Sequence, residues 1–250
     1  MAEHDNWDEH WDRYAAAASR NPAQRMRHDL ILRLLAAKPG DRVLDIGSGQ
    51  GDLMVRLQAT EPRAELLGFE LSASGVAISR RKVPAGKFFV ADLFQPPAEI
   101  AGFKDWAHAA VCSEVLEHVD SPTDFLKAAR PYLAEGARLV VTVPGGPMSA
   151  FDRHIGHRQH FTRESISRVL TDAGFSVERV CLSGFPFFNL YRGVVILRGE
   201  KLAADVNAGQ ESSSAGLANA VMAVFRGLFR FNLMNSPFGW QVVAVARKTG

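Results

Sequence analysis

Residues 43–52, with the sequence VLDIGSGQGD, restrict the fold of this chain more than any other stretch. Val43, Leu44 and Ile46 form the apolar run that is typical of a strand covered on both faces. The glycines that follow at every second position let the backbone adopt positive φ and let a ligand approach the peptide planes. The next helix directs its free N–H groups toward the same place. This order predicts a crevice for a nucleotide-like ligand at the end of the first strand. A tight turn without a ligand fits the same residues.

The spacing of the glycines separates two kinds of nucleotide site. Gly47, Gly49 and Gly51 form G-x-G-x-G, whereas the dinucleotide motif G-x-G-x-x-G needs a glycine at the position of Asp52. Asp45 lies directly before the turn, where its negative charge would repel a pyrophosphate and attract a cationic ligand. The stretch therefore favours a cationic nucleotide-like ligand over a dinucleotide.

Residues 43–51 match the motif V-L-D-I-G-x-G-x-G at every specified position, and in this the chain resembles the class I S-adenosylmethionine (SAM) dependent methyltransferases. The resemblance implies SAM as cofactor, S-adenosylhomocysteine (SAH) as product, and no metal. SAM carries a sulfonium and an ammonium and no phosphate, which suits an acidic glycine loop. The residues expected around SAM are Asp45, Gly47, Ser48, Gly49, Glu70, Leu71, Asp92, Leu93, Ser113 and His118.

Three later strand ends supply the remaining SAM contacts. Glu70 lies about twenty residues past the glycine turn, where an acid can accept hydrogen bonds from two ribose hydroxyls. By the resemblance, Asp92 takes the adenine amino group and Leu93 packs near the ring. Residues 113–119 resemble the family segment E-V-L-E-H, which approaches the methionine part of SAM and faces the acceptor. A structural Glu117–His118 pair that only fixes the loop is an equal alternative.

Strand-like and helix-like segments alternate along the chain, which predicts an α/β fold with helices on both faces of the sheet. Right-handed crossovers then place the loops after the first four strands on one rim. We expect a Rossmann-like, doubly wound, seven-stranded sheet, mostly parallel with an antiparallel last strand, plus a helical cap. Its further strands are expected at 65–70, 87–93, 106–112, 138–143, 175–183 and 241–247. A helix is expected from Pro122 to Glu135, and segments 94–104 and 151–161 are expected to be non-helical.

The chain divides into a SAM-binding domain, residues 1–183 and 241–250, and a helical insertion, residues 184–240. Residues 1–38 are expected to form an N-terminal helical lid. Trp7, Trp11 and Tyr14 share one helix face there, and this face either packs on the sheet or covers SAM. The insertion is expected to cap the acceptor. A helical hairpin on the core, a homodimer contact and peripheral membrane contact through an apolar run with arginines are its alternatives.

The segment after the fifth strand is the candidate acceptor site. The histidines at 154, 157 and 160 have metal-ligand spacing in pairs, but Arg153 and Arg158 between them disfavour a bound cation. A solvated polar loop is an alternative. Asp-x-x-x-Gly-His-x-x-x-Phe resembles a segment of a bacterial methyltransferase subgroup that acts on small molecules. We predict that His157 is the catalytic base, that Asp152 orients it, and that His154 and His160 are substitutes.

Composition excludes several classes of partner. The net charge is only +2, so no nucleic-acid partner is expected. No apolar run reaches the ~18–20 residues of a membrane-spanning helix. The polar N-terminus is unlike a signal peptide, and Cys112 and Cys181 lie in apolar runs typical of buried thiols. These features predict a cytoplasmic protein.

The combined prediction is a SAM-dependent methyltransferase that transfers a methyl group in line to a small-molecule acceptor, in secondary-metabolite or sugar biosynthesis. An oxygen acceptor is slightly preferred over nitrogen because the histidine-rich loop offers a base, and carbon is not excluded. A lipid-linked acceptor and a non-catalytic SAM-binding interaction protein are the alternatives.

Overall fold

The computed structural model of the protein describes residues 7–8, 21–207 and 215–250, with residues 198–207 and 215–220 described through their backbone only. Trp11 and Tyr14, two of the three aromatic residues expected on the N-terminal helix, lie outside the described residues.

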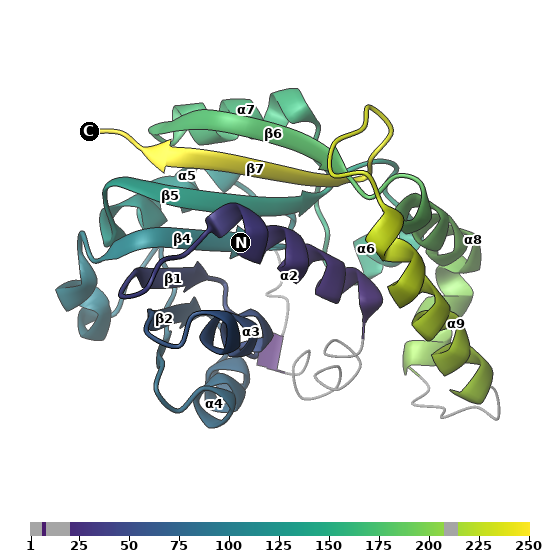
Figure 1. The fold of residues 1–250 in the computed structure, drawn as a ribbon, viewed down its shortest axis with the longest axis horizontal. Coiled ribbons are helices and arrows are strands. Elements are labelled where there is room, and N and C mark those ends of the chain that lie inside the picture. Colours follow the sequence, from purple (N-terminus) through teal and green to yellow (C-terminus); the bar gives the residue numbers. More distant parts are fainter. Residues whose placement is uncertain (1–6, 9–20, 208–214) are drawn as a thin grey trace.

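A seven-stranded sheet with the order β3-β2-β1-β4-β5-β7-β6 forms the centre of the described part of the molecule (Figure 1). Its strands are β1 (Arg42–Ile46), β2 (Glu65–Glu70), β3 (Lys87–Val90), β4 (Ala107–Ser113), β5 (Leu133–Pro144), β6 (Phe175–Ser183) and β7 (Gln241–Lys248). Strands β3, β2, β1, β4 and β5 pair in parallel, whereas β7 pairs antiparallel with both β5 and β6. The predicted fold class is confirmed.

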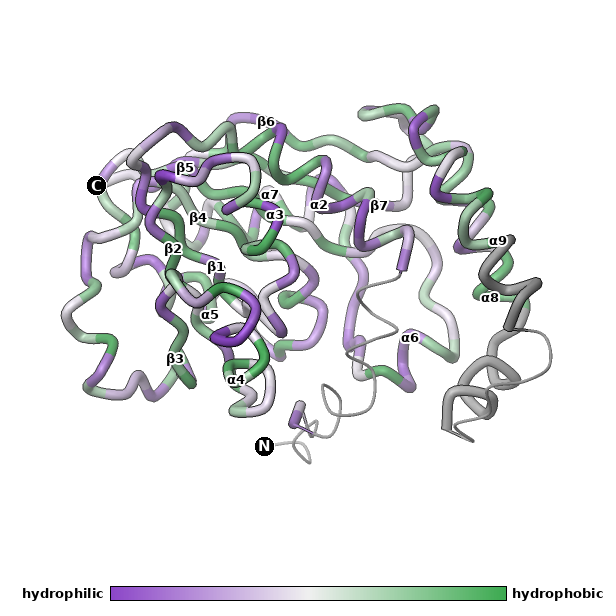
Figure 2. The backbone as a smooth tube through the Cα atoms, turned by 60° about the horizontal axis from the view of Figure 1, so that its bottom comes forward, coloured by the Kyte–Doolittle hydropathy of each residue, from purple (hydrophilic) through white to green (hydrophobic). Residues whose placement is uncertain are grey.

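Helices cover both faces of the sheet, because successive side chains of each strand point to opposite faces. One face carries α2 (Pro22–Leu35), α3 (Asp52–Thr60) and α4 (Ala73–Lys82), and the other carries α5 (Pro122–Ala129) and α7 (Arg163–Asp172) (Figure 1). Within β1, Val43 joins the first core, while Leu44 and Ile46 join the second. Figure 2 shows hydrophobic residues gathered along the central strands.

Local sequence signals set the helix starts that shape the site. The side chain of Asn21 accepts a hydrogen bond from the N–H of Ala23 at 2.9 Å, and Pro22 occupies the first turn of α2. Ser72 caps α4 in the same way. Gly47 has φ +76°, and an added Cβ there would lie 2.4 Å from a methyl of Val115, so the turn requires glycine.

The expected end of one helix and the expected start of the next strand were wrong. Helix α5 ends at Ala129 rather than Glu135, and a 3₁₀ turn at Arg130–Tyr132 leads into β5, which begins at Leu133. Pro131 accounts for the early end, because proline lacks the N–H that a helix needs and clashes with the preceding turn. Leu133 is fully buried and pairs with β4, which extends the strand.

Two segments expected to be non-helical contain short helices. Residues Ala98–Phe103 form a 3₁₀ helix that buries Ile100 completely. Helix α6 (Ala150–His154) forms because Ser149 and Asp152 make a reciprocal capping box. The following Gly156 has φ +89°, so the glycine limits this helix without preventing it.

The insertion forms α8 (Phe187–Asn207) and α9 (Ala215–Leu228), followed by a 3₁₀ turn at Phe229–Phe231. The two helices lie beyond the carboxyl ends of the parallel strands (Figure 1). Phe188 of α8 and Phe229 pack with Ala23 and Met26 of α2 in a third apolar cluster. Within the described residues, no helix is both long and apolar enough to cross a lipid bilayer.

Candidate active site

A cavity of about 520 Å³ lies where the carboxyl ends of β1, β4 and β5 meet the insertion. The glycine loop, the start of α2, the segment after β4, α6 and the helices α8 and α9 all contribute to its wall. Of the predicted residues, it is lined by Asp45, Gly47, Ser48, Gly49, Ser113, His118, Asp152 and His157. Part of the predicted rim is therefore brought together, and helices of the insertion line one side of the cavity, whereas Glu70, Leu71, Asp92, Leu93, His154 and His160 lie outside its lining.

Glu70 ties the glycine loop to the end of β2. Its Oε2 accepts a hydrogen bond from the N–H of Gly49 at 2.7 Å, and its Oε1 accepts one from the N–H of Ser72 at 2.9 Å. Burial raises the pKa of this carboxyl, and the N–H donors act in the opposite direction. Glu70 thus has a structural role in the loop that the sequence-based argument did not anticipate.

Asp45 brings a second acid to the same place. The side chain is 3% exposed, and burial, together with the nearby Glu70, raises its pKa to about 7. A cation in the cavity would favour the ionised form of Asp45, because opposite charges attract strongly in a poorly solvated site. The site is thus suited to a positively charged ligand.

The residues expected around adenine follow the neighbouring strands, outside the lining of this cavity. Leu71 is 50% exposed after β2, and Leu93 is buried after β3. A carboxylate oxygen of Asp92 accepts a hydrogen bond from the N–H of Phe94 at 2.9 Å, which shapes the turn there. Their adenine contacts stay a prediction.

Residues 7–8 of the N-terminal segment reach the rim. The carboxylate of Asp8 accepts hydrogen bonds from the hydroxyl of Ser72 at 2.5 Å and from the N–H of Ser74 at 3.0 Å. The ring of Trp7 meets the ring of His118 edge-on at 4.8 Å between centroids. Trp7 lines the cavity, which agrees with a lid at this one described point.

Asp152 anchors the other end of the cavity. It is fully buried, and both its oxygens accept hydrogen bonds from a guanidinium N–H of Arg192 in α8, at 3.0 and 2.8 Å. Burial raises the pKa of this carboxyl, but the donors from Arg192 and Ser149 outweigh it and hold the pKa at about 2. Sequence reasoning missed Arg192, because its partner lies 40 residues away along the chain.

Two of the three histidines in the loop come together. His157 Nδ1 and His160 Nε2 are 3.3 Å apart, and His160 Nδ1 lies 3.1 Å from the carbonyl oxygen of Gly146. Because a carbonyl oxygen only accepts, the Nδ1–H of His160 donates to Gly146, which leaves the Nε2 of His160 as an acceptor. The Nδ1–H of His157 therefore donates to that Nε2. The remaining ring nitrogen of His157, Nε2, carries a lone pair. His154, by contrast, is exposed and does not line the cavity.

His157 is neutral at neutral pH. Burial, followed by the neighbouring His118, lowers its pKa to about 3, although Asp152 pulls in the other direction. The shortest distance between the His157 ring and Asp152 is 4.0 Å, from Nδ1 to Oδ1, so no direct hydrogen bond joins them. The predicted pair is therefore joined through the backbone, where the N–H of His157 donates to the carbonyl oxygen of Asp152 at 2.9 Å, and not through the ring and the carboxylate.

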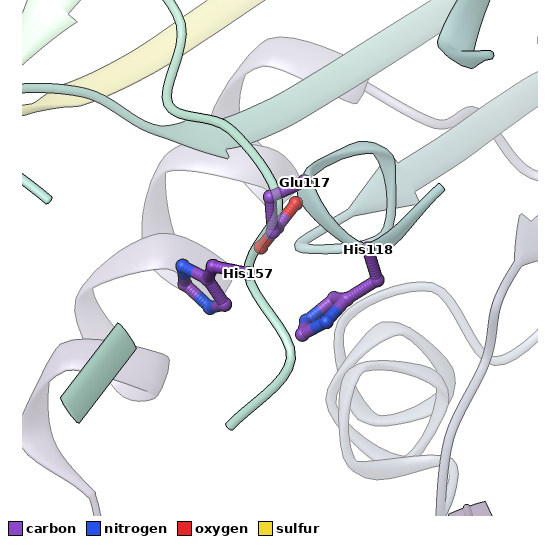
Figure 3. A group of neighbouring side chains, drawn as sticks. All are labelled: Glu117, His118 and His157. Atoms are coloured by element: carbon purple, nitrogen blue, oxygen red, sulfur yellow. The ribbon is translucent and has the colours of Figure 1, made fainter. Parts of the chain in front are cut away.

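Glu117 is the member of this site whose burial could not be foreseen. It is fully buried, it lines the cavity, and neither carboxylate oxygen has a hydrogen-bond partner among the described residues. Figure 3 shows its carboxyl group next to the rings of His118 and His157. Glu117 and His118 both line the cavity, and the choice between an acceptor-facing role and a structural role for this pair stays a prediction.

A larger cavity of about 640 Å³ lies on the far side of Trp240, against Phe161, Arg163 and Phe238. Its lining shares only Trp240 with the active-site cavity and contains no glycine-loop residue. We therefore place the chemistry in the smaller cavity.

A family model described as a methyltransferase domain matches residues 11–180. The chain belongs to the class I SAM-dependent methyltransferases. This methyltransferase family uses SAM as its methyl donor. The match covers the glycine loop, the acids at 45, 70 and 92, and the histidine loop, but not the insertion.

Curated relatives match the same core of this methyltransferase. An uncharacterised 37.1 kDa protein from a transposon of Streptomyces fradiae is 31% identical over 176 residues, which cover 63% of this chain and 50% of that protein. Demethylmenaquinone methyltransferase of Thermus thermophilus is 32% identical over 161 residues, which cover 55% of this chain and 69% of the relative. The chain thus spans about half of the first of these relatives.

Geranyl diphosphate C-methyltransferase from Streptomyces coelicolor, solved with Mg²⁺ and S-adenosyl-L-homocysteine, has a similar fold. The TM-score is 0.58 at 16% identity, and the alignment covers 90% of this chain and 76% of that chain. The likeness at this identity concerns the fold alone.

Proposed function

We propose that this methyltransferase transfers the methyl group of SAM in line to an oxygen of a small-molecule acceptor. In this proposal SAM lies against the glycine loop, Asp45 and Glu70, and the acceptor lies toward Glu117, His157 and the insertion. The observation that carries it is a single cavity with the buried acid Asp45 and the glycine loop at one end and the half-buried, neutral His157 at the other.

The size and closure of the cavity support a small acceptor. The α8–α9 side is lined by Phe188, Tyr191, Val195 and Met222, which exclude water from the reacting atoms. The relatives act on demethylmenaquinone and trans-aconitate by their names, and both are small molecules. Buried free thiols at Cys112 and Cys181 agree with a reducing, cytoplasmic setting.

In the transfer, an oxygen lone pair of the acceptor forms a bond to the methyl carbon while the carbon–sulfur bond breaks. The electron pair of that bond goes to sulfur, which leaves as SAH. For a hydroxyl acceptor, the proton goes to the free Nε2 of His157. Burial lowers the pKa of His157 to about 3, so the ring is neutral at neutral pH and has a lone pair to offer, but it is a weak base and the proton moves to it only as the new bond forms.

Two experiments test this function. Calorimetric titration should show binding of SAM and SAH and no binding of NAD, because the loop lacks the dinucleotide spacing. With an acceptor found by screening candidates for SAM turnover, His157→Ala should lower kcat by about 10²–10⁴, the range for a lost general base. His154→Ala is the matched control in the same loop and should behave as the wild type. Binding of NAD without SAM would contradict the whole assignment.

A lipid-linked acceptor is the second candidate, and one observation favours it. Leu190, Val194 and Leu197 of α8 and Val224 of α9 are 57, 45, 89 and 59% exposed, so the insertion presents apolar side chains outward. Such a face suits an interfacial contact with a bilayer or with a second copy of the chain. Flotation with anionic vesicles distinguishes the two, because a protein that binds the bilayer rises with the vesicles and a dimer stays at the bottom of the gradient. Light scattering of the dimer should give twice the mass of one chain.

A further inference from the structure

Three side chains from two separate segments converge at the acceptor end of the cavity. Glu117 and His118 belong to the 3₁₀ turn Leu116–His118 that follows β4, and His157 follows α6. Figure 3 shows the three groups around a common space, and one potential ligand atom from each lies within 4.8 Å of the others. Two imidazoles and a carboxylate at this spacing form a set that first-row divalent metals accept.

The state of Glu117 points to a ligand at this place. A fully buried carboxyl that makes no hydrogen bond costs free energy unless a partner satisfies it. The residue lines the cavity, so its partner can come from the ligand side. A cation provides this partner, and a buried carboxylate oxygen is a strong ligand for it.

The surroundings of His157 have the arrangement that metal-binding histidines use. The carbonyl of Gly146 and the ring of His160 hold the His157 ring from the Nδ1 side, which leaves the Nε2 lone pair for a ligand. Such outer contacts orient a histidine and fix its tautomer for metal binding.

Positive charges near the cluster are already paired. Arg192 donates to Asp152, Arg27 lies 3.6 Å from an oxygen of Glu114, and Arg158 forms an ion pair with Asp120 at 2.5 Å. Arg153 is exposed on α6. The sequence-based objection that arginines disfavour a bound cation therefore does not apply to the folded site.

We propose that Glu117, His118 and His157 bind a divalent metal ion of the Zn²⁺, Co²⁺ or Mn²⁺ class, which holds the acceptor oxygen. This inference rests on the proposed function, because the ion has this role only if the acceptor occupies that end of the cavity. The acceptor hydroxyl binds to a coordination position of the ion that the protein leaves open. The ion lowers the pKa of this hydroxyl, which then loses its proton to solvent more readily. The bare oxygen attacks the methyl carbon and the carbon–sulfur bond breaks toward sulfur. With the ion bound, His157 is a ligand and takes no proton, so in this inference the ion replaces His157 in activating the hydroxyl, while methyl transfer from SAM to an oxygen stays as proposed.

Titration of the chelator-treated, full-length protein with Co²⁺ tests the site directly. Calorimetry and visible absorption should show one ion per chain. The isosteric change Glu117→Gln should weaken Co²⁺ binding by at least about 100-fold, since it removes a charged ligand. His108→Ala is the matched control, because this exposed histidine lies at the opposite end of β4, and its variant should bind as the wild type does.

A second measurement covers the case in which Glu117→Gln fails to fold. In the wild-type protein, the diamagnetic ion Zn²⁺ should shift the side-chain NMR resonances of His118 and His157 and leave those of His108 in place. The absence of saturable Co²⁺, Zn²⁺ or Mn²⁺ binding, or equal Co²⁺ binding by the folded Glu117→Gln variant, would overturn the proposal.

Titration of the same samples with SAH separates this inference from the proposed function. SAH binding without metal binding overturns the metal site and leaves the function standing. Failure to bind SAH contradicts the function itself. Full methyl transfer after removal of metal by a chelator shows that the reaction proceeds without the ion, and would also overturn the proposal.

Discussion

At the scale of single residues, two buried acids at the strand ends set the chemistry of the donor site. Asp45 and Glu70 both have raised pKa values, and for both burial is the largest cause. Water solvates a carboxylate better than this cavity does, so each acid needs a partner. Glu70 has two N–H donors from the chain, whereas a cationic ligand fits beside Asp45.

We expect the affinity for SAM to depend on pH through Asp45. Its pKa of about 7 in the empty site means that the acid is mostly protonated at pH 6 and mostly ionised at pH 8. Because the cation of SAM favours the ionised form, the dissociation constant should rise up to about tenfold per pH unit below 7. Calorimetry at several pH values measures this. Asp45→Asn should bind more weakly at pH 8 and remove most of the pH dependence, and an unchanged slope would place the titrating group elsewhere.

Replacement of Glu70 should weaken SAM binding. Glu70→Ala removes the acceptor of the Gly49 and Ser72 N–H groups and the predicted ribose contact, which together are worth about 1.5–3 kcal/mol. Titration with SAM measures the loss. Glu65→Ala, an exposed glutamate at the other end of β2, is the matched control and should leave the affinity unchanged. Equal affinities in the two variants would contradict the placement of SAM.

At the scale of elements, a short helix and a long one are joined by a charged pair. Helix α6 holds Asp152 in its capping box, and α8 supplies Arg192 from the insertion. The pair fixes the position of α6 relative to α8, because Asp152 is fully buried and accepts hydrogen bonds both from Ser149 in its own segment and from Arg192 in α8.

We expect Arg192→Leu to lower the free energy of unfolding by about 3–5 kcal/mol, since it leaves a buried carboxylate without its counter-charge. The wild-type pKa of Asp152 is about 2, below its ordinary value, so its ionised form stabilises the fold above pH 4 and this contribution disappears as the pH falls through 2. Denaturant unfolding at pH 7 measures the effect. Arg153→Leu, an exposed change on α6, should stay within about 0.5 kcal/mol of the wild type.

At the scale of the whole molecule, the insertion is a separate addition to a complete sheet. Ser183 at the end of β6 and Gln241 at the start of β7 are paired directly, so the two strands could be joined by a short turn. The intervening residues instead form helices that line one side of the cavity and pack on α2.

Replacement of residues 185–239 by Asn-Gly should leave a folded sheet that binds SAH within about tenfold of the wild type, because the glycine loop and its acids belong to other elements. Methyl transfer should be lost, because the wall of the acceptor site is removed. Circular dichroism, SAH titration and turnover measure the three properties. Loss of SAH binding in a folded variant would show that the insertion helps to hold the donor.

Patterns within a few residues of sequence were sufficient for the fold and for the family. The glycine spacing after β1, the caps at Asn21 and Ser72, and the acid at the end of β2 depend on backbone geometry that short stretches determine by themselves. The lengths of α5 and α6 were misjudged where one local signal competed with another, as at Pro131 and Gly156.

The acceptor end, by contrast, was decided by tertiary structure. The sequence alone identified a histidine-rich loop, but only packing brought His157 next to Glu117 and excluded His154. Arg192 meets Asp152 across 40 residues of chain. Burial, pKa and the absence of a hydrogen-bond partner are properties of an environment that distant segments create together. The sequence therefore determined the fold and the family, and only the folded chain determined which side chains line the cavity.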